Sequence, residues 1–175
     1  MKKVALGADH GGFFLKGEIR KALLSKGYQA LDLGTNTQDP CDYPLYAYKV
    51  AKAVSERKAD FGILICRSGN GMAIVANKLP RVRAAICYDR NVARLSRQHN
   101  DANILVLGSE HLFDEPESIV REWLEASFEG GRHKRRVDQI TKVEREVRAL
   151  PDRVRRRSLP DRVRRRFLAE RSRTK

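Results

Sequence analysis

The sequence is poor in cysteine and contains no long apolar run. Its 175 residues include three cysteines, Cys41, Cys66 and Cys87, an odd and sparse set that argues against a disulfide framework and favours a reducing cytoplasm. No apolar run approaches the roughly 20 residues that a membrane-spanning helix needs, and the first residues, 1–4, do not resemble a signal peptide. No cysteine or histidine spacing matches a zinc site. We therefore expect a cytoplasmic protein without a membrane segment or a bound metal.

Acidic residues are outnumbered, and the excess positive charge gathers at one end. The formal net charge is +14, of which residues 145–175 supply +9. Within this stretch LPDRVRRR occurs twice, at 150–157 and 159–166. A polybasic arm can bind nucleic acid or anionic surfaces without specificity; the alternative, which we favour, is a disordered or loosely helical extension without a catalytic role. We predict one domain over 1–148 and an arginine-rich repeat tail over 149–175.

Strand-like and helix-like segments alternate along the chain. Strand patterns fall at 3–8, 28–33, 60–66, 82–87 and 103–108, and helical patterns fall at 14–26, 43–57, 72–78, 90–98 and 116–128. This alternation is typical of a parallel sheet with helices on both faces. The predicted fold class is α/β: a three-layer, doubly wound, Rossmann-like domain with a five-stranded parallel sheet, followed by a C-terminal helix and the basic tail.

The C-terminal helical pattern follows the glycine pair at 130–131, after the sheet is complete. Its apolar residues recur at spacings of three and four: Val137, Ile140, Val143 and Val147. This apolar stripe needs a surface to cover it. Packing on a partner subunit and folding back on its own domain agree equally well with the pattern.

The most informative segment begins where the third strand pattern ends, on Cys66. A loop, Arg67–Gly71, follows, and then a helical segment, Met72–Lys78. In open α/β sheets, ligands bind outside the carboxyl ends of the strands. Glycine lets the backbone approach an anion closely, and a helix N-terminus favours negative charge. We expect the same field to lower the pKa of the Cys66 thiol, which makes Cys66 a candidate acid, base or nucleophile.

Two other enzyme classes place phosphates on such loops, and neither fits. A cysteine phosphatase needs arginine six residues after the cysteine, where this chain has Met72. A P-loop nucleotidase needs glycine, lysine and then serine or threonine, whereas Gly71 is followed by methionine and alanine. A nucleic-acid-binding protein that uses the basic tail is the non-enzymatic alternative.

Four further patches complete a recognisable pattern. They are Gly7–Gly12 (GADHGG), Asp42–Pro44 (DYP), Ser96–Asp101 (SRQHND) and Gly130–His133 (GGRH) with the nearby Arg136. With the cysteine loop they resemble the ribose-5-phosphate isomerase B family, which includes the galactose-6-phosphate isomerase subunits, over about residues 1–148. The resemblance implies a cofactor-free aldose–ketose isomerase that interconverts ribose 5-phosphate and ribulose 5-phosphate through an enediolate. Isomerisation of a hexose 6-phosphate, allose or galactose, is the alternative within the family.

The resemblance also assigns roles. Cys66 becomes the base that moves a proton between C2 and C1 of the sugar, and the N–H groups of Arg67–Gly71 become an oxyanion hole. His99 opens the sugar ring with Asp9 as its partner, and cations hold the phosphate. The implied catalytic residues are Cys66, His99, Asp9 and Ser68, and the implied substrate contacts are His10, Tyr43, Arg67, Gly69, Asn70, Gly71, Asn100, Arg132 and Arg136.

Two positions depart from the family's pattern. Many members carry arginine after the fifth strand, where this chain has Glu110, a carboxylate that would repel a phosphate unless it points away or the preferred substrate has changed. The bulky Arg67 follows the cysteine directly in an SGNG loop. Some members with that loop use a glutamate base, but Met72 occupies its place here, so Cys66 stays the candidate.

Quaternary structure follows from the same resemblance. Because the family's site is shared between two subunits, we expect a homodimer or homotetramer with shared active sites, a phosphorylated sugar as substrate and no cofactor. His133 lies between two implied phosphate contacts in the sequence. We expect it on the helix surface.

Overall fold

The computed structural model describes residues 1–151 of the chain. A five-stranded sheet with the order β2-β1-β3-β5-β4 lies at its centre, and every pair of neighbouring strands is parallel. The strands are β1 (Lys3–Ala8), β2 (Gln29–Asp32), β3 (Phe61–Cys66), β4 (Ala84–Ile86) and β5 (Ile104–Gly108). The helices are η1 (His10–Gly12), α1 (Phe13–Ser25), α2 (Tyr43–Ser55), α3 (Asn70–Ala76), α4 (Arg90–Asn100), α5 (Pro116–Glu125) and α6 (Gly131–Ala149).

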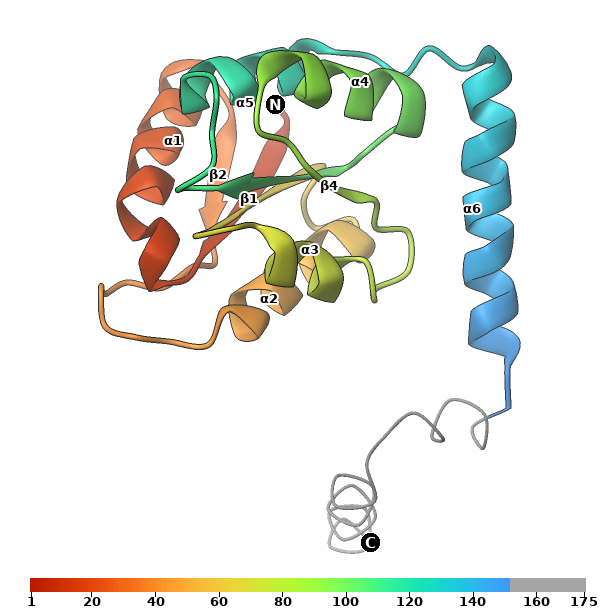
Figure 1. Ribbon diagram of the computed structural model, residues 1–175, viewed down its shortest axis with the longest axis horizontal. Coiled ribbons are helices and arrows are strands. Elements are labelled where there is room, and N and C mark those ends of the chain that lie inside the picture. The colour runs from red at the N-terminus through yellow and green to blue at the C-terminus, as the bar shows by residue number, and fades with distance from the viewer. Residues whose placement is uncertain (152–175) are drawn as a thin grey trace, which may run out of the picture. The chain divides into compact units, whose positions relative to one another are not determined.

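Helices cover the sheet on both faces. Helices α1, α4 and α5 lie on one face, and α2 and α3 on the other (Figure 1). The central strands β3 and β5 are buried along their whole length, as expected of parallel strands that are covered twice. On the first face the rings of Phe61 and Trp123 meet edge to face, with centroids 5.3 Å apart. The predicted three-layer, doubly wound five-stranded sheet is confirmed.

Several element boundaries differ from the sequence patterns for local reasons. Helix α2 ends at Ser55, because Arg57 adopts a φ of 59° that a helix cannot contain. Helix α5 ends at Glu125, since the following Ala126 is extended. Helix α4 continues to Asn100, and Asp101, with a φ of 47°, ends it. This last difference matters for function, because it places the end of the Ser96–Asp101 patch on a helix.

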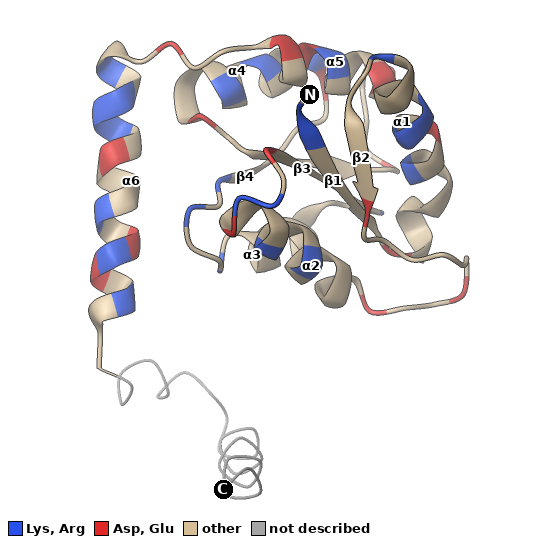
Figure 2. Cartoon of the chain, turned by 180° about the vertical axis from the view of Figure 1, so that it is seen from behind, with Lys and Arg blue, Asp and Glu red and all other residues tan. Residues whose placement is uncertain are grey.

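Two compact units divide the chain at residue 137. The sheet, its covering helices and the first turns of α6 belong to the first unit, and residues from 138 belong to the second. Along α6, a basic first part is followed by interspersed basic and acidic residues (Figure 2), and its apolar residues Ile140, Val143 and Val147 are about half exposed. From residue 152 onward the predicted repeat tail lies outside the described residues. Within residues 1–151, no helix is both long and apolar enough to cross a membrane.

Candidate active site

The strand order reverses between β1 and β3, the point at which open α/β sheets form a ligand-binding crevice. Helices α1 and α3, which follow these two strands, lie on opposite faces of the sheet, so the loops after β1 and β3 lead to opposite faces. These loops touch at Gly11, where a Cβ atom would lie 2.7 Å from Cγ of Arg67. The GADHGG patch and the cysteine loop therefore form one surface.

Cys66 is the last residue of β3, and the loop that follows wraps its sulfur in backbone donors. Its side chain is buried, and the N–H of Gly69 donates to Sγ at 3.2 Å. Gly69 has a φ of 78°, a conformation that favours glycine. The N–H groups of Ser68 and Met72 also interact favourably with the thiolate. The loop thus directs these donors at Sγ, where they favour the thiolate over the thiol.

Burial nevertheless dominates the electrostatics of this thiol. Desolvation raises the pKa of Cys66, the carboxylate of Asp9 raises it further, and the N–H groups of the loop oppose both effects without cancelling them. The expectation of a lowered thiol pKa was therefore wrong. The sequence pattern revealed the donors, but it did not reveal how completely the sheet would exclude water from Sγ.

Asp9 and His10 follow β1 and have well-defined hydrogen bonds. The buried carboxylate of Asp9 accepts from the N–H groups of Gly11 at 3.0 Å and Gly12 at 3.3 Å, and so caps η1. Nδ1 of His10 accepts from the N–H of Cys41 at 3.2 Å. An accepting Nδ1 leaves the proton of the neutral ring on Nε2. His10 can therefore present a donor to an anionic ligand.

Tyr43 forms a wall of the same crevice. It is the first residue of α2, and a Cβ atom on Gly71 would lie 2.5 Å from its ring, so the ring packs directly on the glycine backbone. Ser68 and Asn70 are exposed beside it. One chain thus brings together the predicted residues of the two strand-end loops and the start of α2: Asp9, His10, Tyr43, Cys66, Arg67, Ser68, Gly69, Asn70 and Gly71.

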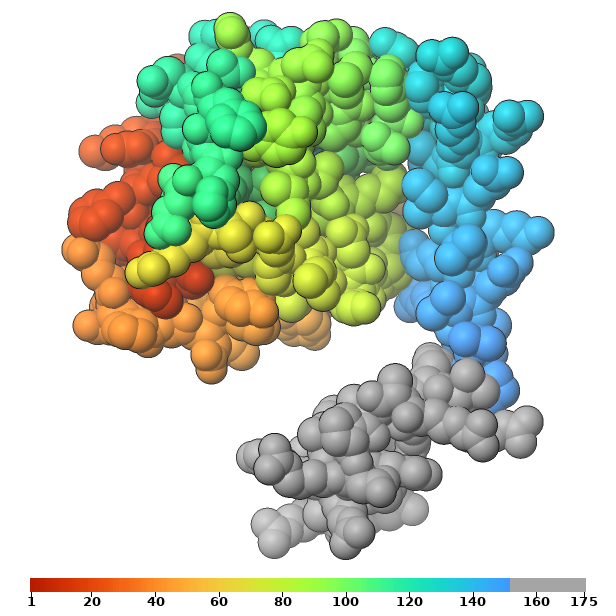
Figure 3. All heavy atoms as spheres, viewed as in Figure 1, coloured from red at the N-terminus to blue at the C-terminus, as the bar shows by residue number. Residues whose placement is uncertain are grey.

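Arg67 and Glu110, the two departures from the family's pattern, contact each other. The N–H of Glu110 donates to the carbonyl of Arg67 at 3.2 Å, and Nε of Arg67 lies 3.6 Å from Oε1 of Glu110. The loop after β3, in yellow, and the segment after β5, in teal, lie side by side on this surface (Figure 3). The carboxylate of Glu110 is therefore paired with the guanidinium group of Arg67.

His99 and Asn100 lie at the amino ends of the strands, whereas Cys66 lies at their carboxyl ends. They occupy the last turn of α4, which leads into the amino end of β5, whereas Cys66 is level with Gly108 at the carboxyl end of β5. A five-residue strand rises about 3.3 Å per residue, so the amino and carboxyl ends of β5 are more than about 13 Å apart along the strand. Within one chain, His99 reaches neither Cys66 nor Asp9. A pairing of His99 with Asp9 between subunits stays a prediction.

His99 belongs instead to a second cluster, built with the start of α6. Its ring is stacked on that of His133, with centroids 4.1 Å apart and 2° between the planes. Each Nε2 lies 3.8 Å from Oε2 of Glu129. Nε of Arg132 donates to Nε2 of His133 at 3.3 Å, and Arg136 follows one helical turn later.

Sequence reasoning missed two members of this cluster. His133, expected on the helix surface, is only 6% exposed, and Glu129 was assigned no role. Their spacing of four residues across the GGRH patch was the available signal, but it becomes informative only once α4 is known to end beside them.

The same cluster contains ligand atoms of the kind that bind metals. Among residues 1–151, nitrogen or oxygen atoms of His99, Glu129 and His133 lie within 4.8 Å of one another. The lone pairs of two parallel stacked rings cannot converge on one ion, however, and Arg132 already donates to one of the nitrogens. The arrangement is thus unfavourable for a metal ion.

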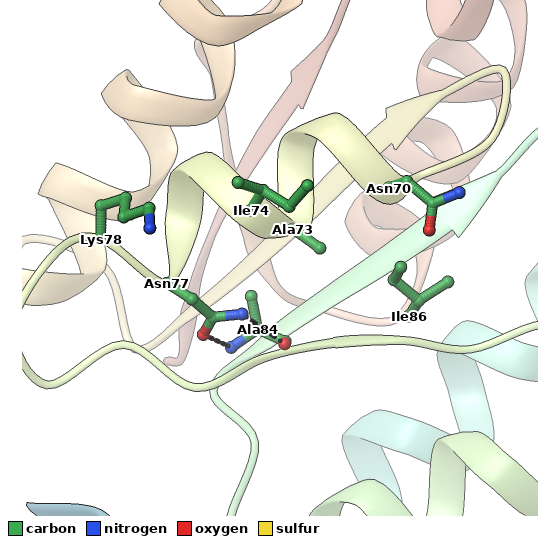
Figure 4. A pocket seen from close by; sticks show the side chains of 7 residues that line it. All are labelled: Asn70, Ala73, Ile74, Asn77, Lys78, Ala84 and Ile86. Carbon is green, nitrogen blue, oxygen red and sulfur yellow. Dashed lines mark hydrogen bonds between the residues drawn. The ribbon is translucent and has the colours of Figure 1, made fainter. Parts of the chain in front are cut away.

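An open groove of about 510 Å³ lies between α3 and the edge strand β4. One end is closed by Asn77, whose side chain exchanges two hydrogen bonds with the backbone of Ala84, each 2.9 Å long (Figure 4). The other end reaches Asn70 in the cysteine loop. Its lining mixes polar and apolar residues: Asn70, Ala73, Ile74, Asn77, Lys78, Ala84 and Ile86.

Comparison with known proteins identifies the family. The family model described as Ribose/Galactose Isomerase matches residues 4–140. Ribose-5-phosphate isomerase B of Escherichia coli is 48% identical over 145 residues, 82% of this chain and 97% of that protein. The structure of ribose-5-phosphate isomerase B from Clostridium thermocellum, 46% identical, has a TM-score of 0.81 and covers 83% of this chain and 99% of its own. The enzyme from Mycoplasma genitalium, solved with bound ribulose-5-phosphate, is 42% identical, has a TM-score of 0.79 and covers 82% of this chain and 97% of its own. The chain belongs to the Ribose/Galactose Isomerase family.

Proposed function

We propose that this protein interconverts ribose 5-phosphate and ribulose 5-phosphate, using Cys66 as the base and no cofactor. The observation that carries the proposal is the buried sulfur of Cys66, surrounded by N–H donors of its own loop at the reversal point of the sheet. The relatives support the substrate, since the Escherichia coli protein is named for it and the Mycoplasma genitalium enzyme was solved with ribulose-5-phosphate.

The geometry suits proton transfer between neighbouring carbons. The Cys66 thiolate takes the proton from C2 of the open aldose, the electron pair moves onto the carbonyl oxygen, and the N–H groups of the loop stabilise the resulting enediolate. The proton of the C2 hydroxyl then moves to O1, and the same thiol returns its own proton to C1 as the C2 carbonyl forms, which gives the ketose. A raised thiol pKa lowers the thiolate fraction but makes each thiolate a stronger base toward a weakly acidic carbon.

Ring opening precedes this step, because ribose 5-phosphate is mainly a closed ring. In our proposal the ring oxygen gains a proton from His99 as its bond to C1 breaks, and the C1 hydroxyl releases its proton to solvent. Phosphate binding combines His10 beside the crevice with Arg132 and Arg136 of the second cluster. Guanidinium groups one helical turn apart suit a phosphate dianion.

These roles need two chains. Cys66 and His99 lie at opposite ends of the strands of one sheet, so we propose that each active site combines the Cys66 crevice of one subunit with the His99 cluster of another. The groove that ends at Asn70 and the exposed apolar residues of α6 offer surfaces for such a partner. The expected homodimer or homotetramer with shared sites follows from this division.

Mixing two impaired variants tests both the residues and the shared site. Cys66→Ala chains, expected to bind sugar phosphate without turning it over, and His99→Asn chains, expected to retain only slow turnover because ring opening is uncatalysed, are denatured together and refolded. Random pairing leaves one intact composite site in each mixed dimer, so turnover recovers to about one quarter of the wild-type value. Cys66→Ala mixed with a Cys66→Ala/His99→Asn chain is the matched control, since no pairing restores a complete site. Absence of recovery, or normal turnover by Cys66→Ala alone, contradicts the proposal.

The choice of sugar is tested separately. The Arg67–Glu110 pair occupies space beside the cysteine loop, which favours a pentose phosphate over the hexose alternative. We expect ribose 5-phosphate to be isomerised with a higher kcat/KM than allose 6-phosphate or galactose 6-phosphate. A higher value for either hexose would reverse the assignment.

A further inference from the structure

One buried imidazole has no role in the proposed mechanism. His133 is 6% exposed, although it belongs to the first turn of a helix whose neighbouring residues are exposed. Its ring lies parallel to that of His99, and Glu129 lies at the same distance, 3.8 Å, from Nε2 of each ring. The three side chains come from α4, the loop before α6, and α6 itself.

The surroundings of His133 favour its neutral form. Nε of Arg132 donates to Nε2 of His133, so that nitrogen must be unprotonated and the ring proton must lie on Nδ1. Burial lowers the pKa of His133, and the positive charges of His99, Arg132 and Arg136 lower it further, against the opposing effect of Glu129. A neutral ring can stack on a protonated His99 without charge repulsion.

We propose that His133 is a positioning residue, whose neutral ring fixes the plane of His99 and leaves the exchangeable proton of the pair on His99. The proposal rests on the proposed function, in which His99 donates that proton to the sugar ring oxygen. Glu129 contributes by facing both rings, so it favours a proton on whichever ring can hold one. Because burial disfavours a proton on His133, as do the charges of Arg132 and Arg136, the proposal leaves the proton to His99.

A double-variant comparison distinguishes this role from a general contribution to folding or phosphate binding. We expect His133→Ala to lower kcat for ribose 5-phosphate about tenfold or more with little change in KM, because proton transfer by a well-placed group contributes at least that much. The double variant His99→Asn/His133→Ala should be no slower than His99→Asn alone, since His133 acts through His99. Losses that multiply in the double variant, or a loss confined to KM, would overturn the proposal.

Two further variants and one spectrum sharpen the test. His133→Phe retains a neutral stacked ring and should keep more activity than His133→Ala, whereas His111→Ala, which removes an exposed histidine elsewhere, should leave turnover unchanged. In ¹H–¹⁵N spectra of the imidazoles, His133 should stay in the Nδ1–H form at pH values where His99 becomes protonated. Protonation of His133 before His99 contradicts the inference.

Solvent exchange separates this inference from the proposed function. Ribulose 5-phosphate cannot close a five-membered ring because its C5 oxygen carries the phosphate, so exchange of its C1 hydrogen with deuterium oxide needs the base but no ring opening. Exchange should persist in the His99 and His133 variants and disappear in Cys66→Ala. If Cys66→Ala still exchanges, or His99→Asn turns over ribose 5-phosphate normally, the proposed function fails. If only the His133 variants turn over normally, the positioning role alone fails.

Discussion

Arg67 and Glu110 form an ion pair between the loops after β3 and β5, with Nε and Oε1 3.6 Å apart. At both positions we expected a departure from the family's pattern, and the two side chains pair with each other. The acidic side chain that would repel a phosphate is paired with a basic side chain that directly follows Cys66. Both side chains are more than half exposed, so the pair can open readily.

Replacement of Glu110 by glutamine should strengthen substrate binding. Removing the carboxylate frees Arg67, one of the expected substrate contacts, from its ion-pair partner, and an exposed pair contributes at most about 1 kcal/mol, so KM for ribose 5-phosphate should fall by no more than about fivefold. The thermal unfolding temperature should stay nearly constant. In an Arg67→Ala background the same replacement should have a smaller effect on KM. Equal effects in both backgrounds would show that Arg67 does not mediate the change.

The pH dependence of turnover should reflect the raised pKa of Cys66. Because the thiolate is the base, kcat/KM should rise with pH, and the rise should continue beyond the usual thiol range, since burial keeps the proton on sulfur. Initial rates from pH 6 to 10 measure this profile. Cys66→Ser supplies the control, because any residual turnover of a variant without a titrating thiol should not show this rise. If kcat/KM already reached a plateau at pH 7.5, the pKa of the catalytic thiol would not be raised and the prediction would fail.

Three glycine-to-alanine variants should separate stability from activity. At Gly12 a Cβ atom would lie 2.5 Å from the carbonyl oxygen of Ile65, so the backbone must shift and overpacking should cost about 1–3 kcal/mol of folding stability. At Gly71 the clash is with the partly exposed Tyr43 ring, which can rotate; stability should change little and KM should rise. Gly17, on α1 with no atom within 4 Å of a Cβ position, is the control, and alanine there should stabilise by up to about 1 kcal/mol. Urea denaturation measures the stability of the three variants, and steady-state kinetics measure KM. A Gly71→Ala chain less stable than Gly12→Ala would contradict the prediction.

The sequence was sufficient to predict the layers and the Cys66 crevice for a physical reason. Alternating buried strands and amphipathic helices leave few alternatives to a doubly wound sheet, and the reversal point of such a sheet brings the loops after β1 and β3 together. Asp9 directly follows β1 and Cys66 ends the neighbouring β3, so their proximity follows from topology alone. Local pattern and global fold agree at these positions.

The second cluster could not be predicted in the same way. Its members come from the end of α4, a loop and the start of α6, and their contacts depend on where α4 ends, which Asp101 determines through a single positive φ. The prediction of a lowered pKa for Cys66 was wrong for a related reason. Desolvation depends on the packing of the whole sheet, whereas hydrogen bonds to the sulfur can be anticipated from the loop.

Cys87 should make the protein less stable in alkaline solution. Burial raises the pKa of its thiol to about 11, from about 9 for an accessible thiol, so the folded protein holds this proton more tightly than the unfolded chain. Above pH 9 the unfolded chain releases the proton, and the contribution of Cys87 to stability is lost as the pH rises from about 9 through 11. Urea denaturation at pH 8 and pH 10 should show a smaller fall in unfolding free energy for Cys87→Ala than for wild type. The control is Cys41→Ala, which removes a half-buried thiol; its unfolding free energy should fall by as much as that of the wild type. An identical fall in all three proteins would mean that Cys87 ionises in the folded state as readily as in the unfolded one.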